Sequence, residues 1–290
     1  MADIDVRLIE DPGDMVAVEE LQRVVWPGGE TEIVPVHMLR AITNNGGVLL
    51  GVYDADLLVG FVFGFPGLDE KSVDARPKHA SHLAAIHPDY RDLGLGFELK
   101  RAQWQIVRSQ GLDHIIWTYD PLESRNANLN ISKLGAVCNT YIPEYYGEMH
   151  DGLNVGMPSD RFKVDWWVNT RRVEQRLNVQ QRNSLSLDQF TSSGALVINP
   201  AVKNDNDILE PGNYSPPHPD FPTSLLLVEI PSNFQTLKEL SADIALAWRL
   251  QTRDIFGSLF ASGYIVTDFI FEHGDRPRSF YVLSYGEAQF

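Results

Sequence analysis

The sequence predicts an α/β protein of the α+β type, with a mixed, mainly antiparallel central sheet flanked by helices. Two apolar runs separated only by Asp54-Ala55-Asp56 indicate a β-hairpin. A third apolar strand, His79–Ile86, leads through a loop with two glycines into an amphipathic helix. A further strand and helix follow, so the expected order over the first half is β-α-α-β-β-β-α-β-α.

Composition limits the functional classes. The chain has 290 residues, of which 43% are hydrophobic and 22% charged, enough to bury the cores of two domains. A net charge of -15 argues against nucleic acid as a partner, because such proteins gather Lys and Arg against phosphates. We find no apolar run of membrane-spanning length and no secretory leader. One cysteine, Cys138, excludes an internal disulfide and a multi-cysteine metal site, which fits a cytoplasmic protein.

The elements before the glycine loop follow from local signals. Asp11-Pro12 is typical of a helix start, with aspartate as the cap and proline at the first helical position. The predicted segments are a strand at Asp5–Ile9, a helix from Pro12 to Val25, a short helix at Val36–Thr43, and the hairpin strands Val48–Tyr53 and Leu57–Phe65. These segments supply one edge of the expected sheet.

The segments after the loop continue the same layer. The helix from about Gly94 to Ser109 is expected to bury the stripe Leu95, Leu99, Ala102 and Ile106. The predicted elements that follow are a strand at His114–Tyr119, a helix at Ser124–Leu134, and strands at Cys138–Ile142 and Arg161–Val168. Residues 1–170 are therefore predicted to form one domain.

The amino-acid composition of the rest of the chain changes at residue 171 and again at residue 224. Residues 171–223 are polar and proline-rich, which predicts a connecting segment with one strand at Ala195–Asn199. Residues 224–290 form an α/β segment with a strand at Leu225–Ile230, a helix at Leu237–Phe260, and strands at Ile265–Phe271 and Phe280–Leu283. This β-α-β-β order repeats that of residues 79–119, so the segment is a candidate degenerate repeat.

The loop Arg91-Asp92-Leu93-Gly94-Leu95-Gly96 carries the clearest chemical signal. It lies where a strand ends and a helix begins, so unpaired amides and the helix dipole can bind a diphosphate. Gly94 and Gly96 would let phosphate oxygens approach the backbone, and Arg91 can add a charge-assisted contact. The structural alternative is that the glycines only permit a tight turn.

The stretch HPDYRDLGLGFELKRAQ resembles the acyl-CoA pyrophosphate loop and third helix of the GNAT N-acetyltransferase superfamily. Trp117–Gly135 resembles the next part of that fold through Asn126, Ala127 and Lys133-Leu134-Gly135. The resemblance covers roughly residues 4–168 and is topological before residue 79. The coenzyme-binding residues that it implies are Ala85, Ile86, Arg91, Asp92, Leu93, Gly94, Leu95, Gly96, Phe97 and Asn126.

The resemblance also implies a GNAT-like fold and a reaction. Acetyl-CoA or a related acyl-CoA would lie where two central strands separate, and an amine would attack its thioester directly without a metal. His82 and Glu123 are candidate bases, although a core histidine and a carboxylate at a helix start explain them equally well. Ile131 stands where the family commonly has a proton-donating tyrosine and cannot be the acid. Packing is the commoner role of aromatic residues at a sheet edge, but the acid could also be one of the nearby tyrosines Tyr119, Tyr141, Tyr145 and Tyr146.

Two functional readings therefore remain. The first is an N-acyltransferase acting on an unidentified amine, for which the acidic surface favours a cationic acceptor. The second is a non-catalytic acyl-CoA-binding or sensor protein. Residues 231–236 lack the glycines of a second coenzyme loop, so one coenzyme site is expected per chain. A second copy of the chain is a further candidate partner.

Overall fold

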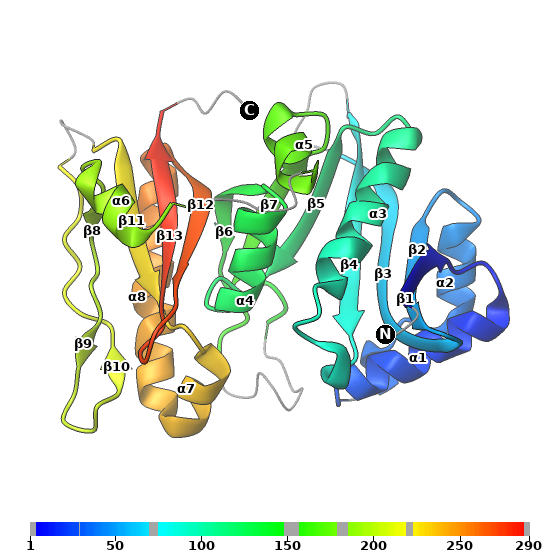
Figure 1. Cartoon of the computed structure of the whole chain (residues 1–290), viewed down its shortest axis with the longest axis horizontal. Helices are drawn as coiled ribbons and strands as arrows, with labels where there is room; N and C mark the ends of the chain where they lie inside the picture. The colour runs from blue at the N-terminus through cyan, green and yellow to red at the C-terminus, as the bar shows by residue number, and fades with distance from the viewer. Residues whose placement is uncertain are drawn as a thin grey trace. The chain divides into compact units, whose positions relative to one another are not determined.

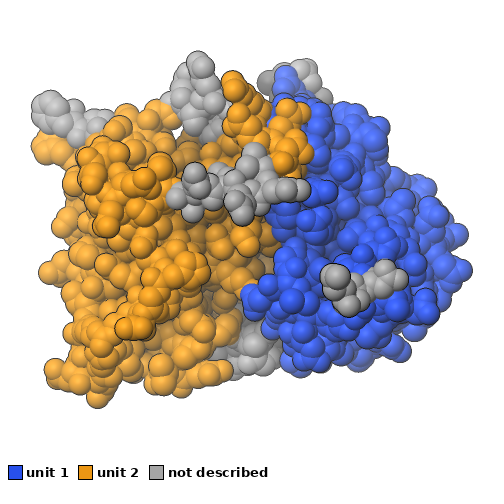
Figure 2. All heavy atoms as spheres, in the orientation of Figure 1, with its two compact units in different colours: residues 1–117, 150–155, 166–170 blue, residues 118–149, 156–165, 171–290 orange. Residues whose placement is uncertain are grey.

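The computed structural model describes residues 4–28, 30–69, 75–147, 157–178, 185–218 and 223–286. The chain divides into two compact units, one mainly of residues 1–117 and the other mainly of residues 118–149 and 171–290 (Figure 2). Each unit has strands with helices packed on them, as the predicted fold class requires (Figure 1). The predicted domain limits at residues 170 and 223 stay a prediction. Among the described helices, none combines the length and apolar character of a membrane span.

The first unit contains strands in the order β1-β2-β3-β4-β5 (Figure 1). Its elements are β1 (Ile4–Leu8), α1 (Pro12–Val25), α2 (Val36–Thr43), β2 (Val48–Asp54), β3 (Leu57–Leu68), β4 (Pro77–Ile86), α3 (Leu95–Ser109) and β5 (His114–Tyr119). Neighbouring strands are antiparallel from β1 to β4, whereas β4 and β5 run parallel. The predicted hairpin and element order are confirmed.

Helices cover both faces of these strands. Phe63 of β3 belongs to the core cluster that includes residues of α1 and α2. A Cβ built on the next residue, Gly64, would lie 3.1 Å from Gln103 of α3. Because successive residues of a strand face opposite sides, α1 and α2 lie on one face and α3 on the other. The start of α1 is as predicted, with the Asp11 side chain accepting a 2.7 Å hydrogen bond from Gly13 N.

The second unit contains strands in the order β7-β6-β12-β13-β11-β8, with β9 and β10 paired separately. Its elements are α4 (Ser124–Ala127), a π-helical turn (Asn128–Lys133), β6 (Val137–Ile142), β7 (Arg161–Trp167), α5 (Arg171–Asn178), α6 (Leu187–Ser192), β8 (Leu196–Val197), β9 (Val202–Lys203), β10 (Leu209–Glu210), β11 (Leu225–Ile230), α7 (Phe234–Leu240), α8 (Ala242–Ala261), β12 (Tyr264–Glu272) and β13 (Arg278–Tyr285). Tyr281 contacts Phe256 of α8, whereas its neighbour Phe280 packs with Phe190 of α6. These helices therefore lie on opposite faces of β13.

Three features differ from the sequence-based expectation. The single helix predicted at residues 237–260 is two helices, because Ser241 is extended and its side chain caps Ile244 N at the start of α8. The predicted connection contains α5 and α6, whose Leu177 and Phe190 are buried. In the C-terminal segment β13 lies between β11 and β12, whereas β4 and β5 are direct neighbours. The repeat is thus one of element order and not of strand pairing.

Candidate functional site

The loop between β4 and α3 has the backbone of an anion-binding helix start. Gly94 occupies the position before the helix in the left-handed region, at φ 81°, and Asp92 has φ 65°. The first helical hydrogen bonds come from the amides of Phe97 and Glu98, and both end on Gly94 O. The amides of Leu95 and Gly96 precede these donors at the open end of the helix, where backbone N–H groups have no intrahelical partner. This end of α3 can accept a negatively charged group.

The surroundings of the loop leave room for a ligand. A Cβ built on Gly94 would meet no described atom within 4 Å. The side chain of Arg91 is exposed, and Leu93 is 63% exposed. The preceding turn is fixed, because Tyr90 donates a 2.9 Å hydrogen bond to Asp54 at the end of β2. The loop therefore combines a held backbone with an open face.

The strands beside the loop separate within the first unit. The β4–β5 ladder consists of two residue pairs, His79 with Ile115 and Ala80 with Ile116. Beyond Ala80, β4 continues to Ile86 in pairing with β3 alone among the described strands. The pairing with β3 shifts between Gly64 and Phe63, which leaves a bulge in β4. A bulge bends and twists a strand, and here it occurs just after the β4–β5 pairing ends.

The outer edge of β4 has free backbone groups beside this opening. His87 N donates to Val59 O on β3, so residues in alternation with His87 also point toward β3. Ala85 follows this alternation and directs its backbone to β3. Ala84 and Ile86 direct theirs to the opposite edge. Two strand residues are expected to contact a coenzyme. Ile86 has its amide and carbonyl on the open side, whereas those of Ala85 point toward β3.

A buried polar cluster lies where β4 and β5 separate. Lys100 of α3 is 4% exposed and donates to Ser81 Oγ at 2.7 Å and to Gln103 Oε1 at 3.1 Å. Its Nζ also lies 4.0 Å from the ring centroid of Trp117. Gln103 Nε2 lies 3.1 Å from His79 Nε2. Burial lowers the pKa of Lys100 to about 7, and burial with the nearby Lys100 lowers the pKa of His79 to about 3.

This cluster was missed by sequence reasoning. The predicted apolar stripe of α3 included Ala102 and Ile106, but the structure buries Lys100, Gln103 and Trp104 instead. Leu95 and Leu99 were predicted correctly. The buried positions 95, 99, 103 and 107 also follow a helical spacing. The polar residue at position 103 is what kept this stripe from being recognised as apolar. The signal that could have revealed the cluster is the pair of polar residues His79 and Ser81 on the facing strand, because a buried polar side chain needs a hydrogen-bond partner.

His82, a candidate base, lies at the bulge of β4. Its ring centroid lies 6.4 Å from that of Phe63 and 6.0 Å from that of Phe65. Part of the side chain is exposed, and packing against these rings lowers its pKa through burial. Neutral imidazole can accept a proton, so the environment is compatible with the predicted role.

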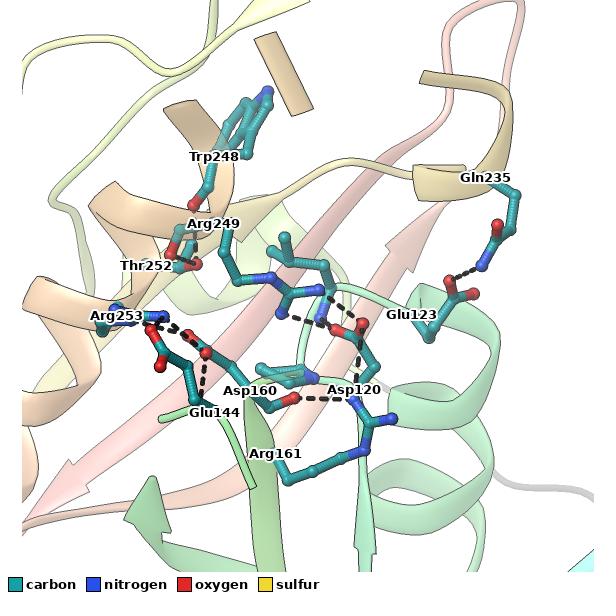
Figure 3. Close-up of polar contacts among 12 residues, drawn as sticks. Asp120, Glu123, Glu144, Asp160, Arg161, Gln235, Trp248, Arg249, Thr252 and Arg253 are labelled. Atoms are coloured by element: carbon teal, nitrogen blue, oxygen red, sulfur yellow. Dashed lines mark hydrogen bonds and ion pairs between the residues drawn. The ribbon is translucent and has the colours of Figure 1, made fainter. Parts of the chain in front are cut away.

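The turn after β5, in the second unit, carries two carboxylates that the C-terminal segment holds (Figure 3). Asp120 accepts hydrogen bonds of 2.8 and 2.5 Å from Arg249, a fully buried residue of α8. Glu123 accepts a 2.5 Å hydrogen bond from Gln235 of α7. Burial is the main cause that raises the pKa of Glu123, Asp120 raises it further, and the bond from Gln235 opposes the shift.

Further contacts fix the same turn. Tyr281 donates a 2.8 Å hydrogen bond to Pro121 O, and the hydroxyls of Ser124 and Ser279 share one of 2.7 Å. The helix that follows becomes π-helical at Asn128–Lys133. Asn126, expected to contact a coenzyme, is exposed on α4. Ile131 is fully buried and has no proton to donate. The roles expected for Glu123 and Asn126 stay predictions.

In the described part of the chain, no group of three or more His, Cys, Asp or Glu side chains is arranged to hold a metal ion. Cys138 is a buried free thiol whose pKa is raised by burial.

No family model matches the sequence, and no curated protein matches it. Solved structures do match. The ribosomal-protein-S18-alanine N-acetyltransferase from Escherichia coli is 12% identical, with a TM-score of 0.44 over 58% of this chain and 95% of that one. NAA60 from Arabidopsis thaliana, in complex with acetyl-CoA, is 14% identical, with a TM-score of 0.45 over 57% and 99%. Ard1 from Thermoplasma volcanium is 17% identical, with a TM-score of 0.41 over 56% and 95%.

Proposed function

We propose that the chain is an N-acyltransferase that transfers an acyl group from acetyl-CoA, or a related acyl-CoA, to an amine. The observation that carries this proposal is the start of α3, where a left-handed Gly94 precedes the amides of Leu95 and Gly96, which have no hydrogen-bond partner among the described residues. Such a helix end binds a diphosphate through N–H groups and the helix dipole. Arg91 is exposed beside it and can form a charge-assisted contact.

The opening between β4 and β5 supports the placement of the rest of the coenzyme. The amide and carbonyl groups of Ala84 and Ile86 lie on the unpaired edge of β4, where an extended pantetheine arm can form strand-like hydrogen bonds. This edge runs from the glycine loop to Ser81, directly before the β4–β5 ladder begins at Ala80. An acyl-CoA bound in this way would carry its thioester toward the point where the strands meet.

The reaction would be a direct attack by a neutral amine on the thioester carbonyl. Holding the two groups in line supplies most of the rate enhancement of such a step. His82 and Glu123 remain the predicted bases, and the lowered pKa of His82 keeps its ring neutral and able to accept a proton near pH 7. The negative charge of -15 favours a cationic acceptor by attraction over distance.

A second candidate is an acyl-CoA-binding or sensor protein without turnover. The observation that favours it is Ile131, a fully buried aliphatic residue at the position where the resembling family carries its tyrosine. Both candidates use the same coenzyme loop, so they differ in turnover and not in binding.

The loop is tested by Gly94→Asp, measured by isothermal titration with acetyl-CoA and with free CoA. A carboxylate at this position would face the diphosphate, so we expect affinity to fall about 100-fold or more. Gly111→Asp is the matched control. Gly111 lies at the other end of α3, has φ 77° against 81° for Gly94, and also has no described atom within 4 Å of a built Cβ. Both variants carry the same backbone strain, and only one carries the charge at the loop.

A thiol-release assay across a panel of amines separates the two candidates. Binding with turnover supports the transferase, and binding without turnover supports the sensor. Equal affinity of folded Gly94→Asp and Gly111→Asp would show that the coenzyme does not bind at this loop and that Arg91–Gly96 is a structural turn.

A further inference from the structure

Lys100 lies at the point where β4 and β5 separate. Ser81 and Trp117 directly follow the last paired residues of the two strands. The Lys100 amine contacts both, at 2.7 Å from Ser81 Oγ and 4.0 Å from the Trp117 ring centroid. Its own helix begins at the coenzyme loop. The Lys100 side chain therefore links α3 to β4 at the point where β4 and β5 separate, and all of these residues belong to the first unit.

In the part of the chain that the structure describes, the cluster around this amine has no opposing charge. Among the described residues, Lys100 is held by Ser81, Gln103 and the face of Trp117, none of which is ionised. His79 is the titratable group nearby, and its pKa of about 3 keeps it neutral, with Nδ1 buried and without a described partner. A buried ammonium without a carboxylate is costly, and departures from such rules concentrate at functional sites.

The position matches the reactive end of a bound acyl-CoA. Residues 81–86 of β4 extend roughly 16 Å at about 3.3 Å per residue, from the closed end of the opening to the start of the loop. With its diphosphate at the loop and its arm along this edge, the coenzyme would bring its sulfur toward Ser81. Ser81 accepts a hydrogen bond from Lys100 and donates its own hydroxyl proton to Gln103 Oε1 at 3.1 Å, so this hydroxyl would turn from Gln103 to the sulfur.

We propose that Ser81 protonates the departing coenzyme thiolate and that the ammonium of Lys100, bonded to Ser81, supplies the proton. This proposal rests on the acyl-transfer function proposed above. It assigns the acid that Ile131 cannot provide to Ser81 of β4, supported by Lys100 of α3. Ser81 is the group that would touch the sulfur, and Lys100 is the proton source and positioning residue behind it.

The step balances as follows in atoms and protons. The amine nitrogen forms a bond to the thioester carbon, and the carbon–sulfur bond breaks with its electron pair on sulfur. The Ser81 hydroxyl proton moves to sulfur while a Lys100 proton moves to Ser81 Oγ, leaving neutral lysine. The proton released by the new amide nitrogen passes to the base, for which His82 and Glu123 are the candidates, and from there to solvent, while Lys100 regains a proton from solvent. A pKa of about 7 suits this cycle, because the ammonium is more acidic than a thiol of pKa ~8.5.

The first test needs no acceptor. CoA bound to the full-length protein is titrated, and its thiolate is followed by ultraviolet absorbance. Lys100 is the stronger acid of the pair and is neutral above about pH 7, so it should give up its proton before the thiol does. We therefore expect the bound thiol to ionise no lower than free CoA in the wild type and in Arg101→Met, which changes an exposed neighbour on the same helix. The buried Cys138 does not interfere, because its pKa is raised.

The second test is the pH dependence of kcat, with an acceptor that titrates outside the range studied. Because the acid must be protonated, activity should fall as pH rises through an apparent pKa near 7. Lys100→Met and Ser81→Ala should each lower kcat about 100-fold, and Lys100→Met should lose the alkaline limb. Both should still bind acetyl-CoA in isothermal titration.

The outcomes separate this proposal from the proposed function. A bound thiol that ionises below free CoA in the wild type but not in Lys100→Met would show that Lys100 keeps its proton beside a thiolate, which overturns its role as the proton source and leaves the coenzyme site intact. An unchanged alkaline limb in a folded Lys100→Met variant also overturns it. Failure of wild-type protein to bind CoA removes the proposed function and this proposal together.

Discussion

At the scale of the residue, the burial of Lys100 leads to a prediction about the pH dependence of folding stability that is independent of any ligand. Its pKa is about 7 in the folded chain, whereas an unfolded lysine titrates near pH ~10.4. The unfolded state therefore holds the extra proton between these values, and stability rises with pH across that window. Below pH 7 both states are charged and the full cost of burying the ammonium is present, on the order of 4 kcal/mol.

We expect Lys100→Met to raise the free energy of unfolding at pH 7 by about 1 to 4 kcal/mol, since an apolar side chain replaces a buried charge. The gain should be smaller at pH 9.5, where the wild-type side chain is already neutral when folded. Urea denaturation at the two pH values measures the difference, and exposed Lys133 replaced by Met is the control. A gain that does not change with pH would contradict a lowered lysine pKa.

Single residues also show where sequence reasoning works. The Asp11 cap and the glycine turn before α3 were predictable, because each depends on the chemistry of one short stretch of backbone. Lys100 was not, because a lysine in an amphipathic helix ordinarily lies on the solvent side. Its burial depends on Ser81 and His79, which are about twenty residues away in sequence and become neighbours only when α3 packs on β4.

At the scale of the element, the strand order and the glycine loop of the first unit follow from hydrophobic period and turn residues. The bulge in β4 does not, because it is a mismatch in pairing between two strands and has no signature in one of them alone. The break between α7 and α8 has a local signal in Ser241, yet the apolar period continues through it. Periodicity therefore identified the helix and missed its interruption.

The start of α7 provides an element-scale prediction. Gln235 is the hydrogen-bond donor to Glu123, and Lys238 and Arg249 add favourable charges while Asp120 opposes them. Gln235→Leu should raise the pKa of the Glu123 carboxyl by about one pH unit, because a hydrogen bond to the ionised form is lost. Carboxyl titration by 13C NMR, with Glu123→Gln for assignment, measures the change.

The neighbouring Thr236→Val keeps the helix and leaves Glu123 untouched, so its titration should match the wild type. If Glu123 is the base, the acidic limb of kcat/KM should move upward with the carboxyl pKa in Gln235→Leu, since a base must be deprotonated. A carboxyl pKa that stays constant in Gln235→Leu would show that this hydrogen bond does not tune Glu123.

At the scale of the whole molecule, the chain passes from the first compact unit to the second within β5, near residue 117, returns to the first unit at residues 166–170 and enters the second again at residue 171, where composition changes. Composition marks polar segments of the chain, but compactness depends on which surfaces bury one another. Phe162 of β7 and Tyr141 of β6 pack on Phe256 of α8, so strands from the predicted N-terminal domain share a core with the C-terminal segment. This long-range packing has no counterpart in local sequence.

The cooperativity of unfolding tests whether the chain unfolds in units that meet near residue 117 or near residue 170. Asp160 is fully buried, accepts hydrogen bonds from Tyr141 and Arg253, and its pKa is lowered because these bonds outweigh the effect of burial. Arg253→Met leaves the carboxylate without its cation, which costs about 3 to 5 kcal/mol for a buried ion pair. We expect hydrogen exchange at β6 and β12 to accelerate together in this variant, while exchange at β2 and β3 keeps its wild-type rate. If β6 instead retains its protection along with β2 and β3 while β12 loses it, the folding boundary lies nearer residue 170, as the sequence predicted.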